Sequence, residues 1–384
     1  MKLKYIISYL ILVANLLHVC AQTDKNKLPA VNFDPLIQRF KKYNYSGDTI
    51  KLPLIHKNKD YKIELSPNPI CFDLKEIVLK NSATKKYPIA YSVIYQGKLI
   101  TLFEPGHFIC YTIATMQRDV EFENKINLKT FQYNWRLDDK LVAISNGKYF
   151  YLNSDNVWLD YAAPPPLINQ PTLFEDSTYI SFCDCYGEFG GTVYFYNKKS
   201  LQVHFAKATC ANSVIKKESK YFVLSELGHG SDHSNLQEIE FPDKLAYVDT
   251  SKLNKRFRFR GEAPPDYIDS SKASKTLFRY WEIAILSAFP YKGKILNLVS
   301  WRDQKFLAEL ENNKFKIVTP LFNKEFFIHD PITNIYDNTI IINYGFYTIA
   351  GDREVSTILI IDDKLIKVDW NEKHNYKPFV IDIK

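Results

Sequence analysis

The sequence predicts an all-β fold, a six-bladed β-propeller built from four-stranded antiparallel blades. Two features of the chain favour this fold: a turn followed by an apolar strand recurs six times, and each unit continues into a second hairpin. Four short strands per unit, repeated about every 40 residues, are typical of a propeller. Aromatic residues make up 15% of the chain, which agrees with this fold, because their side chains fill the space between twisted sheets.

The repeat can be aligned on one apolar position in each of six strands. The intervals between these positions are 42, 38, 42, 74 and 45 residues. The aligned residues are Leu99, Leu141, Tyr179, Tyr221, Ile295 and Ile340. Two residues before each stands a residue that favours tight turns; these are Gly97, Asp139, Ser177, Ser219, Gly293 and Asn338.

The other strands of each unit flank this turn-and-strand segment. Residues 87–94 and 280–289 are upstream partners, and residues 192–205 and 306–318 are second hairpins. The interval of 74 predicts one blade plus an insertion at about residues 251–276. Part of that region has helical spacing instead, through Ala273, Leu277, Trp281 and Ala284.

Strands near residues 61–80 precede the first recognised unit. They can supply a missing strand of the last blade and close the ring, or form a seventh blade. Closure matters because exposed sheet edges promote aggregation. Two stacked β-sandwiches are the structural alternative to the propeller. We expect residues 22–384 to form a single domain.

Over roughly three-quarters of its length the chain resembles secreted bacterial β-propeller proteins as a class. The resemblance depends on the repeat alone, because the Gly-His and Trp-Asp pattern of WD40 blades is absent. The Asp-containing boxes of sialidase-like propellers are absent too, and Ser154–Trp158 is only a weak echo of them. The resemblance therefore implies a fold and no activity.

The first residues predict a signal peptide, residues 1–21. Lys2 and Lys4 precede an apolar run from Tyr5 to Val19, and small residues follow at a cleavage point before Gln22. A spanning helix needs about 20 apolar residues, so we expect no transmembrane segment in the mature chain. The expected location is the periplasm or the medium, with lipidation at Cys20 as the alternative.

Cleavage at this point leaves five cysteines: Cys71, Cys110, Cys183, Cys185 and Cys210. An oxidising compartment favours disulfides. Either Cys183 or Cys185 can reach Cys210 across a hairpin, and Cys71 with Cys110 is the other candidate pair. A bond between Cys183 and Cys185 would be strained, because alternate residues lie on one face of a strand. No second closely spaced pair supports a zinc site.

Charge constrains the partners only weakly. Removing Lys2 and Lys4 lowers the formal net charge from +7 to +5, too small a bias to indicate nucleic acid. We expect a monomer with a protein or carbohydrate partner, in the cell envelope or outside the cell.

The candidate binding residues lie in the connections that follow the six aligned strands, because equivalent connections emerge on one face of the ring. They are His107, Asp184, Glu188, His229, Asp232, His233, Trp301, Arg302 and Arg353. The segment with two histidines and an aspartate can bind a divalent metal if a further ligand joins it. Otherwise it is the polar tip of a hairpin, and no other cofactor is predicted.

Two further segments suggest polar ligands. Trp301 and Arg302 can stack on a sugar and clamp a carboxylate, unless Trp301 is packed between blades. The alternation in residues 255–260 places basic side chains on one side of an extended strand, suited to an acidic polysaccharide or a phosphorylated membrane surface. These basic residues are Lys255, Arg256, Arg258 and Arg260.

These features favour an exported binding or scaffold protein that recognises a ligand or envelope partner through one loop face. The alternative is a glycan-active hydrolase or lyase of propeller fold. Its acid and base would be sought among His107, Glu188, Glu226, His229 and Asp232. An enzyme requires several of these titratable groups around one pocket.

Overall fold

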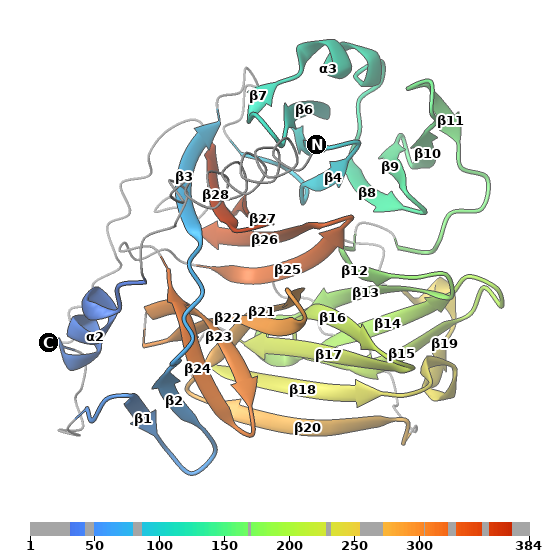
Figure 1. The fold of residues 1–384 in the computed structure, drawn as a ribbon. Helices are drawn as coiled ribbons and strands as arrows, with labels where there is room; N and C mark the ends of the chain where they lie inside the picture. The colour runs from blue at the N-terminus through green and yellow to red at the C-terminus, as the bar shows by residue number, and fades with distance from the viewer. Residues whose placement is uncertain are drawn as a thin grey trace, which may run out of the picture.

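The chain folds into a ring of six small sheets, shown as a ribbon in Figure 1. The computed structural model describes residues 31–42, 50–79, 87–167, 170–227, 232–253, 272–302, 304–321, 328–347 and 353–370. The predicted signal peptide and the basic segment 255–260 lie outside these ranges. The sheets are numbered as blades 1 to 6 in chain order.

Blades 1 to 3 each contain four consecutive antiparallel strands. Blade 1 contains β4 (Val93–Tyr95), β5 (Lys98–Phe103), β6 (His107–Thr112) and β7 (Gln117–Arg118). Blade 2 contains β8 (Tyr133–Leu137), β9 (Lys140–Ser145), β10 (Lys148–Leu152) and β11 (Trp158–Asp160). Blade 3 contains β12 (Thr172–Glu175), β13 (Tyr179–Cys185), β14 (Gly191–Asn197) and β15 (Val203–Lys207).

Blades 4 to 6 repeat the arrangement with longer strands. Blade 4 contains β16 (Ala211–Lys217), β17 (Lys220–Leu227), β18 (His233–Ile239) and β20 (Ser274–Trp281). Blade 5 contains β21 (Ala284–Tyr291), β22 (Lys294–Trp301), β23 (Gln304–Glu311) and β24 (Lys314–Pro320). Blade 6 contains β25 (His329–Tyr336), β26 (Thr339–Tyr347), β27 (Arg353–Ile361) and β28 (Lys364–Trp370).

The six aligned positions of the repeat occupy equivalent places. Each lies on the second strand of its blade, on β5, β9, β13, β17, β22 or β26. The residues predicted to form turns stand between the first and second strands. Five of these turns have two residues, as shown by the pairing of Tyr95 with Lys98 and of Leu137 with Lys140. The six-bladed propeller is confirmed. The seven-bladed ring and the two stacked β-sandwiches are wrong.

The first strand of each blade lies nearest the centre of the ring. There β25 packs against β12, β16 and β21, so the first strand of blade 6 fills much of the space between blades 3, 4 and 5. Serine and threonine side chains suit this crowded centre because they are small and can bond to one another. Ser287 and Thr333 are both buried, and their hydroxyl groups share a hydrogen bond of 2.7 Å.

Apolar clusters between neighbouring blades form the core. The cluster between blades 6 and 1 closes the ring, with Trp370 packed edge-on against Phe103 at a ring-centroid distance of 5.0 Å. Among the described strands, none is shared by the two blades. Instead, the Asn343 amide accepts a hydrogen bond from the Ser92 amide nitrogen and donates one to the Ser92 carbonyl, both at 3.0 Å. This pair of bonds takes the place of strand pairing at the seam.

The N-terminal segment extends two blades at their outer edges. β1 (Leu54–Lys57) pairs with β2 (Lys62–Leu65), which adds to blade 5 in parallel with β24. β3 (Asp73–Leu79) adds to blade 6 in parallel with β28. The predicted strands near 61–80 therefore exist and one joins the last blade, but as a fifth strand. Figure 1 shows β3 beside β28 and β2 beside β24.

Two helices accompany these sheets among the described residues. α2 (Asp34–Lys42) buries Leu36, Ile37 and Phe40 against blade 5. α3 (Val120–Ile126) joins blades 1 and 2, and Asp119 caps it by accepting a hydrogen bond from the Phe122 amide. No helix in the described ranges is long and apolar enough to cross a membrane.

The long interval of the repeat lies between the third and fourth strands of blade 4. It contains the 3-10 turns η2 (Pro242–Lys244) and η3 (Thr250–Lys252), with β19 (Ala246–Val248) between them. β19 pairs with β15 as a fifth strand of blade 3. The helical interpretation of Ala273 to Ala284 is wrong, because residues 274–281 form β20 and pair with β18. Pairing with a neighbouring strand overrides the local spacing.

One disulfide is present among the described cysteines. Cys185 bonds to Cys210, as one of the predicted pairings requires. The other predicted pair, Cys71 with Cys110, is wrong, since the two are not bonded and Cys110 is buried within the strand β6 of blade 1. Asp330 lies close to the Cys185–Cys210 bridge, but sulfurs held in a disulfide are not thiolate ligands for a metal.

Candidate functional site: an axial cavity on the turn face

The ring has two faces that differ in their connections. The turn face carries the turns between first and second strands, and the loop face carries the connections between second and third strands. Because neighbouring strands in a blade are antiparallel, these two sets lie at opposite ends of the blades. Eight of the nine residues predicted from the sequence belong to loop-face connections or to the strand ends beside them, and the ninth, His229, lies outside the described residues.

On the loop face, His107 and Glu188 are exposed on different blades. Asp184 is only 5% exposed, and its carboxylate accepts hydrogen bonds from the Thr192 amide at 2.8 Å and the Tyr194 hydroxyl at 2.6 Å. Asp184 therefore holds β13 to β14. Its carboxylate has a structural task in this sheet.

Trp301 is only 3% exposed and is covered by the N-terminal segment. Phe40 of α2 lies edge-on to its ring at 5.1 Å, and His56 of β1 lies at 4.9 Å. The Arg302 guanidinium stands over the same indole at 4.6 Å. This placement supports the packed interpretation of Trp301, because an indole covered in this way offers no face to a sugar.

The histidine-rich segment is only partly within the described residues. His229 lies outside them, whereas Asp232 and His233 lie beside the start of β18. The Asp232 carbonyl accepts a hydrogen bond from the Glu282 amide at 2.6 Å, and the His233 ring packs against Trp281 at 5.1 Å. The proposed metal site stays a prediction. The Arg353 side chain and the basic residues 255, 256, 258 and 260 also lie outside the described part.

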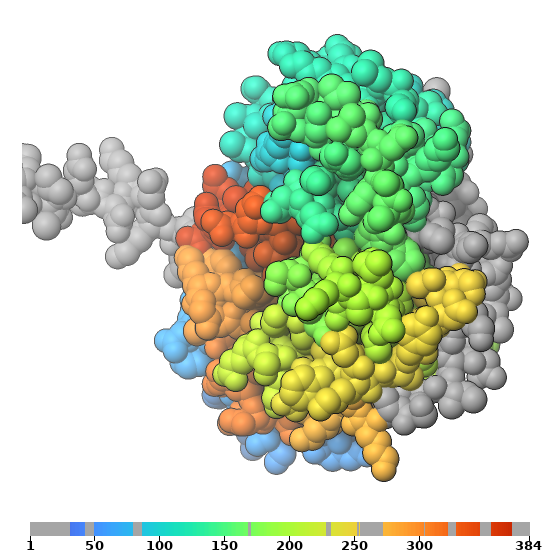
Figure 2. All heavy atoms as spheres, turned by 90° about the vertical axis from the view of Figure 1, so that its right-hand side faces the viewer, coloured from blue at the N-terminus to red at the C-terminus, as the bar shows by residue number. Residues whose placement is uncertain are grey.

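The structure contains a cavity of about 540 Å³ that opens on the opposite, turn face. Its rim is formed by charged residues from the turns of blades 2, 3 and 6, and its deeper part by the first strands of blades 3 to 6. The rim residues are Arg136, Asp138, Asp139, Glu175, Lys198 and Asp337. The deeper residues include Thr172, Ser213, Val214, Ala288, Thr333 and Asn334. We call this space the axial cavity. Figure 2 shows the turn face, where teal, green and red segments meet near the centre.

One side of the rim is organised by Arg136, which is mostly buried. Its guanidinium donates to both carboxylate oxygens of Asp337, at 3.0 and 3.1 Å, and to Asp139 at 2.8 Å. It also donates to the Ile94 carbonyl at 3.2 Å. A guanidinium suits this position because its planar fork meets a carboxylate with two parallel bonds. Arg136 thus connects blade 2 with blades 1 and 6.

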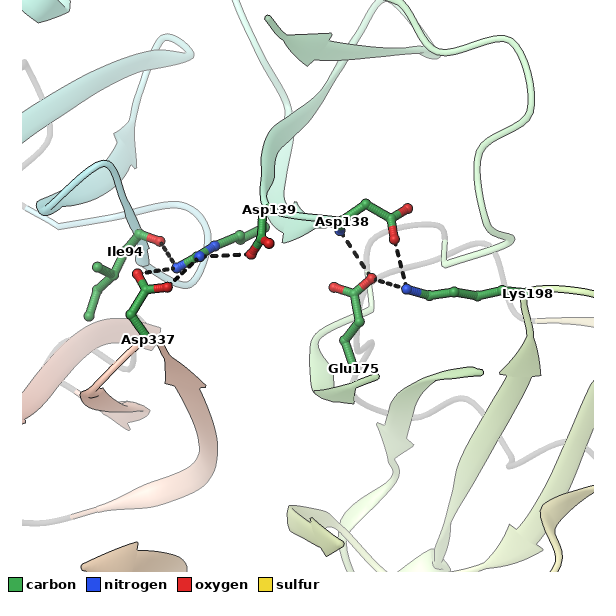
Figure 3. A network of polar contacts seen from close by, with 7 residues as sticks. Ile94, Asp138, Asp139, Glu175, Lys198 and Asp337 are labelled. Atoms are coloured by element: carbon green, nitrogen blue, oxygen red, sulfur yellow. Dashed lines mark hydrogen bonds and ion pairs between the residues drawn. The ribbon is translucent and has the colours of Figure 1, made fainter. Parts of the chain in front are cut away.

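The other side of the rim is organised by Lys198, at the turn between β14 and β15. Its ammonium donates to Glu175 at 2.6 Å and to Asp138 at 2.7 Å. The Asp138 amide also donates to the Glu175 carboxylate at 3.0 Å. Blades 2 and 3 are joined by these contacts. Figure 3 shows the two charged clusters side by side at the cavity rim.

The turn from β8 to β9 explains how both clusters form. Asp138 and Asp139 are its two central residues, with φ values of 47° and 56°. Aspartate tolerates this left-handed conformation better than most residues, and a two-residue turn with both φ positive matches the twist of a hairpin. In this turn one carboxylate bonds to Lys198 and the next to Arg136. A single turn therefore contributes one carboxylate to each cluster.

Burial and ion pairing shift the pKa values of the rim carboxyls in opposite directions. Burial raises the pKa of Glu175, against the hydrogen bonds from Lys198 and the Asp138 amide. Burial also acts on Asp138, but there the hydrogen bond and charge of Lys198 prevail and lower the pKa of that carboxyl. The hydrogen bond from Arg136 lowers the pKa of Asp337. The rim therefore combines a carboxyl that holds its proton more tightly with carboxylates that release it readily.

Deeper in the axial cavity the side chains are small and polar. The Ser213 hydroxyl donates to Thr333 at 3.1 Å and accepts a hydrogen bond from the Ala288 amide at 3.0 Å. The Asn334 amide donates to the Thr172 carbonyl at 2.8 Å. These bonds connect the first strands of four blades, so the lower wall is fixed by cross-blade contacts. Fixed polar walls and a charged rim are typical of a site for a polar ligand.

The sequence predicted the hairpin turns at the rim of the axial cavity, but it did not predict that these turns surround a cavity. Asp139 and Ser177 were identified as turn formers, and both line the axial cavity. Arg136, Glu175 and Lys198 carried no signal, because their contacts join residues far apart in the chain, such as Arg136 with Asp337 and Lys198 with Asp138. The acidic pair at residues 138–139 in a hairpin turn was the one local feature that pointed to the turn face.

Comparisons with known proteins agree on fold only. No protein-family model matches the chain, and no curated protein sequence matches it. BamB from Moraxella catarrhalis is 9% identical with a TM-score of 0.28, over 74% of this chain and 85% of that chain. PorZ of Porphyromonas gingivalis, a surface component of the type-IX secretion system, is 8% identical with a TM-score of 0.34, over 76% and 39%.

An exo-1,5-alpha-L-arabinanase from a bovine ruminal metagenomic library is 8% identical with a TM-score of 0.28, over 73% of this chain and 99% of that chain. Identities and scores this low carry no argument about activity or partners. The chain resembles β-propeller proteins at the level of fold, with no characterised family.

Proposed function

We propose that the protein is an exported binding protein that takes a polar ligand into the axial cavity. The observation that carries this proposal is the cavity itself, with its charged rim assembled from separate blades. Binding residues on a propeller are positioned by rigid blades, as here, where Arg136 and Lys198 are each fixed by two carboxylates. The Cys185–Cys210 disulfide supports export, because disulfides persist in oxidising compartments.

The repeat supplies a matched pair of variants for testing this proposal. Ser177 is exposed in the turn of blade 3 and lines the axial cavity. Ser219 is exposed at the equivalent place in blade 4 and does not line it. Ser177→Trp should obstruct the cavity, whereas Ser219→Trp adds the same bulk away from it.

The labelled protein would be applied to glycan and peptide arrays, and each hit would be titrated in solution. We expect Ser177→Trp to weaken binding by about tenfold or more, the effect of losing ~1.4 kcal/mol, while Ser219→Trp binds like the wild type. Equal binding by both variants would place the ligand outside the axial cavity and overturn the proposal.

A second candidate is a glycan-active hydrolase, favoured by one observation. Glu175 and Asp138 lie together at the rim, and the pKa of the first is raised while that of the second is lowered. Carboxyl pairs of this kind supply an acid and a base in glycoside hydrolysis. Release of reducing ends from a polysaccharide by the wild type, but not by Glu175→Gln, would establish this function. A binding protein releases none.

A further inference from the structure

The rim of the axial cavity holds more negative than positive charge. Arg136 forms ion pairs with the carboxylates of Asp139 and Asp337, and Lys198 forms ion pairs with those of Asp138 and Glu175. Two cations therefore bind four carboxylates, and Lys140 adds a third positive charge near Asp138, which still leaves an excess of negative charge. The nearby Asp176 does not change this balance, because Lys216 binds it at 2.6 Å.

In three of these carboxyl groups one oxygen is bound by neither Lys198 nor Arg136, and a hydrogen bond between side chains also joins Glu175 to Asp138. Lys198 binds only Oδ1 of Asp138 and Oε1 of Glu175, and Arg136 binds only Oδ1 of Asp139. The side chains of Asp138 and Asp139 are 49% and 90% exposed, and that of Glu175 is 24% exposed. Solvent, and hence a ligand, can reach all three groups.

A buried amide inside the cavity adds an independent acceptor. Asn334 lines the axial cavity and is only 8% exposed. Its amide nitrogen is used in the bond to the Thr172 carbonyl, but its carbonyl oxygen accepts no hydrogen bond within the described part of the chain. A ligand that displaces water from this oxygen would keep the acceptor satisfied only if it supplied a donor in return.

We propose that the axial cavity recognises an ammonium group of its ligand. This proposal rests on the proposed binding function. An ammonium offers three donors and a positive charge. It matches the excess of carboxylate oxygens at the rim and the Asn334 oxygen below them. The apolar side chains of Leu173, Phe174 and Ile335 also line the cavity and suit the carbon skeleton that carries the ammonium.

Two sources can present this group to an exported protein: the side chain of lysine and the amine of an amino sugar. The shared chemistry is a primary amine that is protonated at neutral pH. Acetylation removes the charge and two of the three donors in both cases. Two matched probe pairs therefore separate the chemistry from its source.

The probes are a tripeptide with a central lysine and a blocked N-terminus and its Nε-acetyl form, and glucosamine and N-acetylglucosamine. Binding to the purified full-length mature protein would be measured by calorimetry at neutral pH and low salt. We expect the amine of at least one pair to bind about tenfold or more tightly than its acetylated form, because charge-assisted hydrogen bonds are roughly twice as strong as neutral ones. The pair that responds identifies the source.

Two variants test whether the rim is responsible. The double variant Asp138→Asn with Glu175→Gln keeps the shape of the rim and removes its charge, so it should lose most of the preference for the amine. Glu121→Gln is the control, since Glu121 is exposed on α3, which joins blades 1 and 2 on the loop face. Circular dichroism would confirm that each variant is folded.

Failure of this inference is distinguishable from failure of the proposed function. Equal binding of amine and acetylated probes, or no binding of either by a folded wild type, would overturn the ammonium proposal. An unchanged preference in the folded double variant would do the same. If Ser177→Trp still abolished binding of a neutral or anionic array hit, the cavity would remain the binding site with a different ligand.

Discussion

Arg136 both connects neighbouring blades and forms part of the rim of the axial cavity. It is 10% exposed in its side chain, while its partners Asp139 and Asp337 are 90% and 71% exposed. Exposed carboxylates contribute little to stability, because water and salt screen them. We therefore interpret the cluster mainly as a device that fixes the rim of the axial cavity between blades 2 and 6.

The Asp337–Arg136 pair predicts a specific dependence of stability on pH. The pKa of Asp337 is lowered in the folded protein, so its stabilising effect is complete above the ordinary pKa, about 3.9. It is lost as the pH falls through the lowered folded value. Asp337→Asn should reduce the free energy of unfolding by no more than about 1 kcal/mol at neutral pH.

This difference would be measured by urea unfolding at several pH values between neutral and strongly acidic. The wild type and Asp337→Asn should converge as the pH falls below the ordinary pKa of an aspartate. A difference that stays constant over that range would contradict an ionic origin.

At the scale of elements, local signals predicted the hairpins well. Gly97, Asp139 and Gly293 all occupy turn positions with positive φ, and such turns are specified by a few adjacent residues. The parallel pairing of β3 with β28 could not be predicted, because nothing near residues 73–79 encodes a partner about 290 residues away. The rim of the cavity was hidden for the same reason, since Arg136 and Asp337 are 201 residues apart.

β20 shows why periodicity can mislead. Ala273, Leu277 and Trp281 are spaced as on a helix, yet Leu277 and Trp281 are exposed on an outer strand. The pairing register of β20 shifts at residue 277, and such a bulge interrupts the alternation of side chains along a strand. Its structure is set by pairing with β18, which lies well upstream in the chain.

The disulfide connects the end of β13 to the segment before β16, across 25 residues. Replacing both Cys185 and Cys210 by serine should lower the free energy of unfolding by about 3 kcal/mol, because the bond restricts the unfolded chain. Urea unfolding would be compared with the wild type under oxidising and strongly reducing conditions. The reduced wild type should match the double variant, and a difference between them would contradict this explanation.

At the scale of the whole molecule, the ring is closed by packing and not by a shared strand. The N-terminal segment supports it from outside, with β2 and β3 covering the outer edges of blades 5 and 6. The same segment buries Trp301 under Phe40 and His56. The edges of β24 and β28 are therefore already paired, and the outermost strands of these two blades are β1 and β3. Because loss of the segment would expose the strands β24 and β28, we propose that it limits self-association.

Deletion of residues 22–86 from the predicted mature chain tests this role. The outer edges of β24 and β28 and the Trp301 surface would become exposed, so the truncated protein should aggregate. Size-exclusion chromatography with light scattering would compare it with the full mature chain. A monodisperse truncated monomer with the thermal stability of the wild type would show that the segment is dispensable.

If the ligand binds on the turn face, it should protect the backbone amides of the rim turns. Hydrogen–deuterium exchange with and without a bound array hit would measure this protection. We expect slower exchange at residues 137–140, 174–178 and 336–339, which form the rim turns. Protection confined to loop-face residues 104–107, 186–190 and 301–302, with the rim turns unchanged, would contradict it.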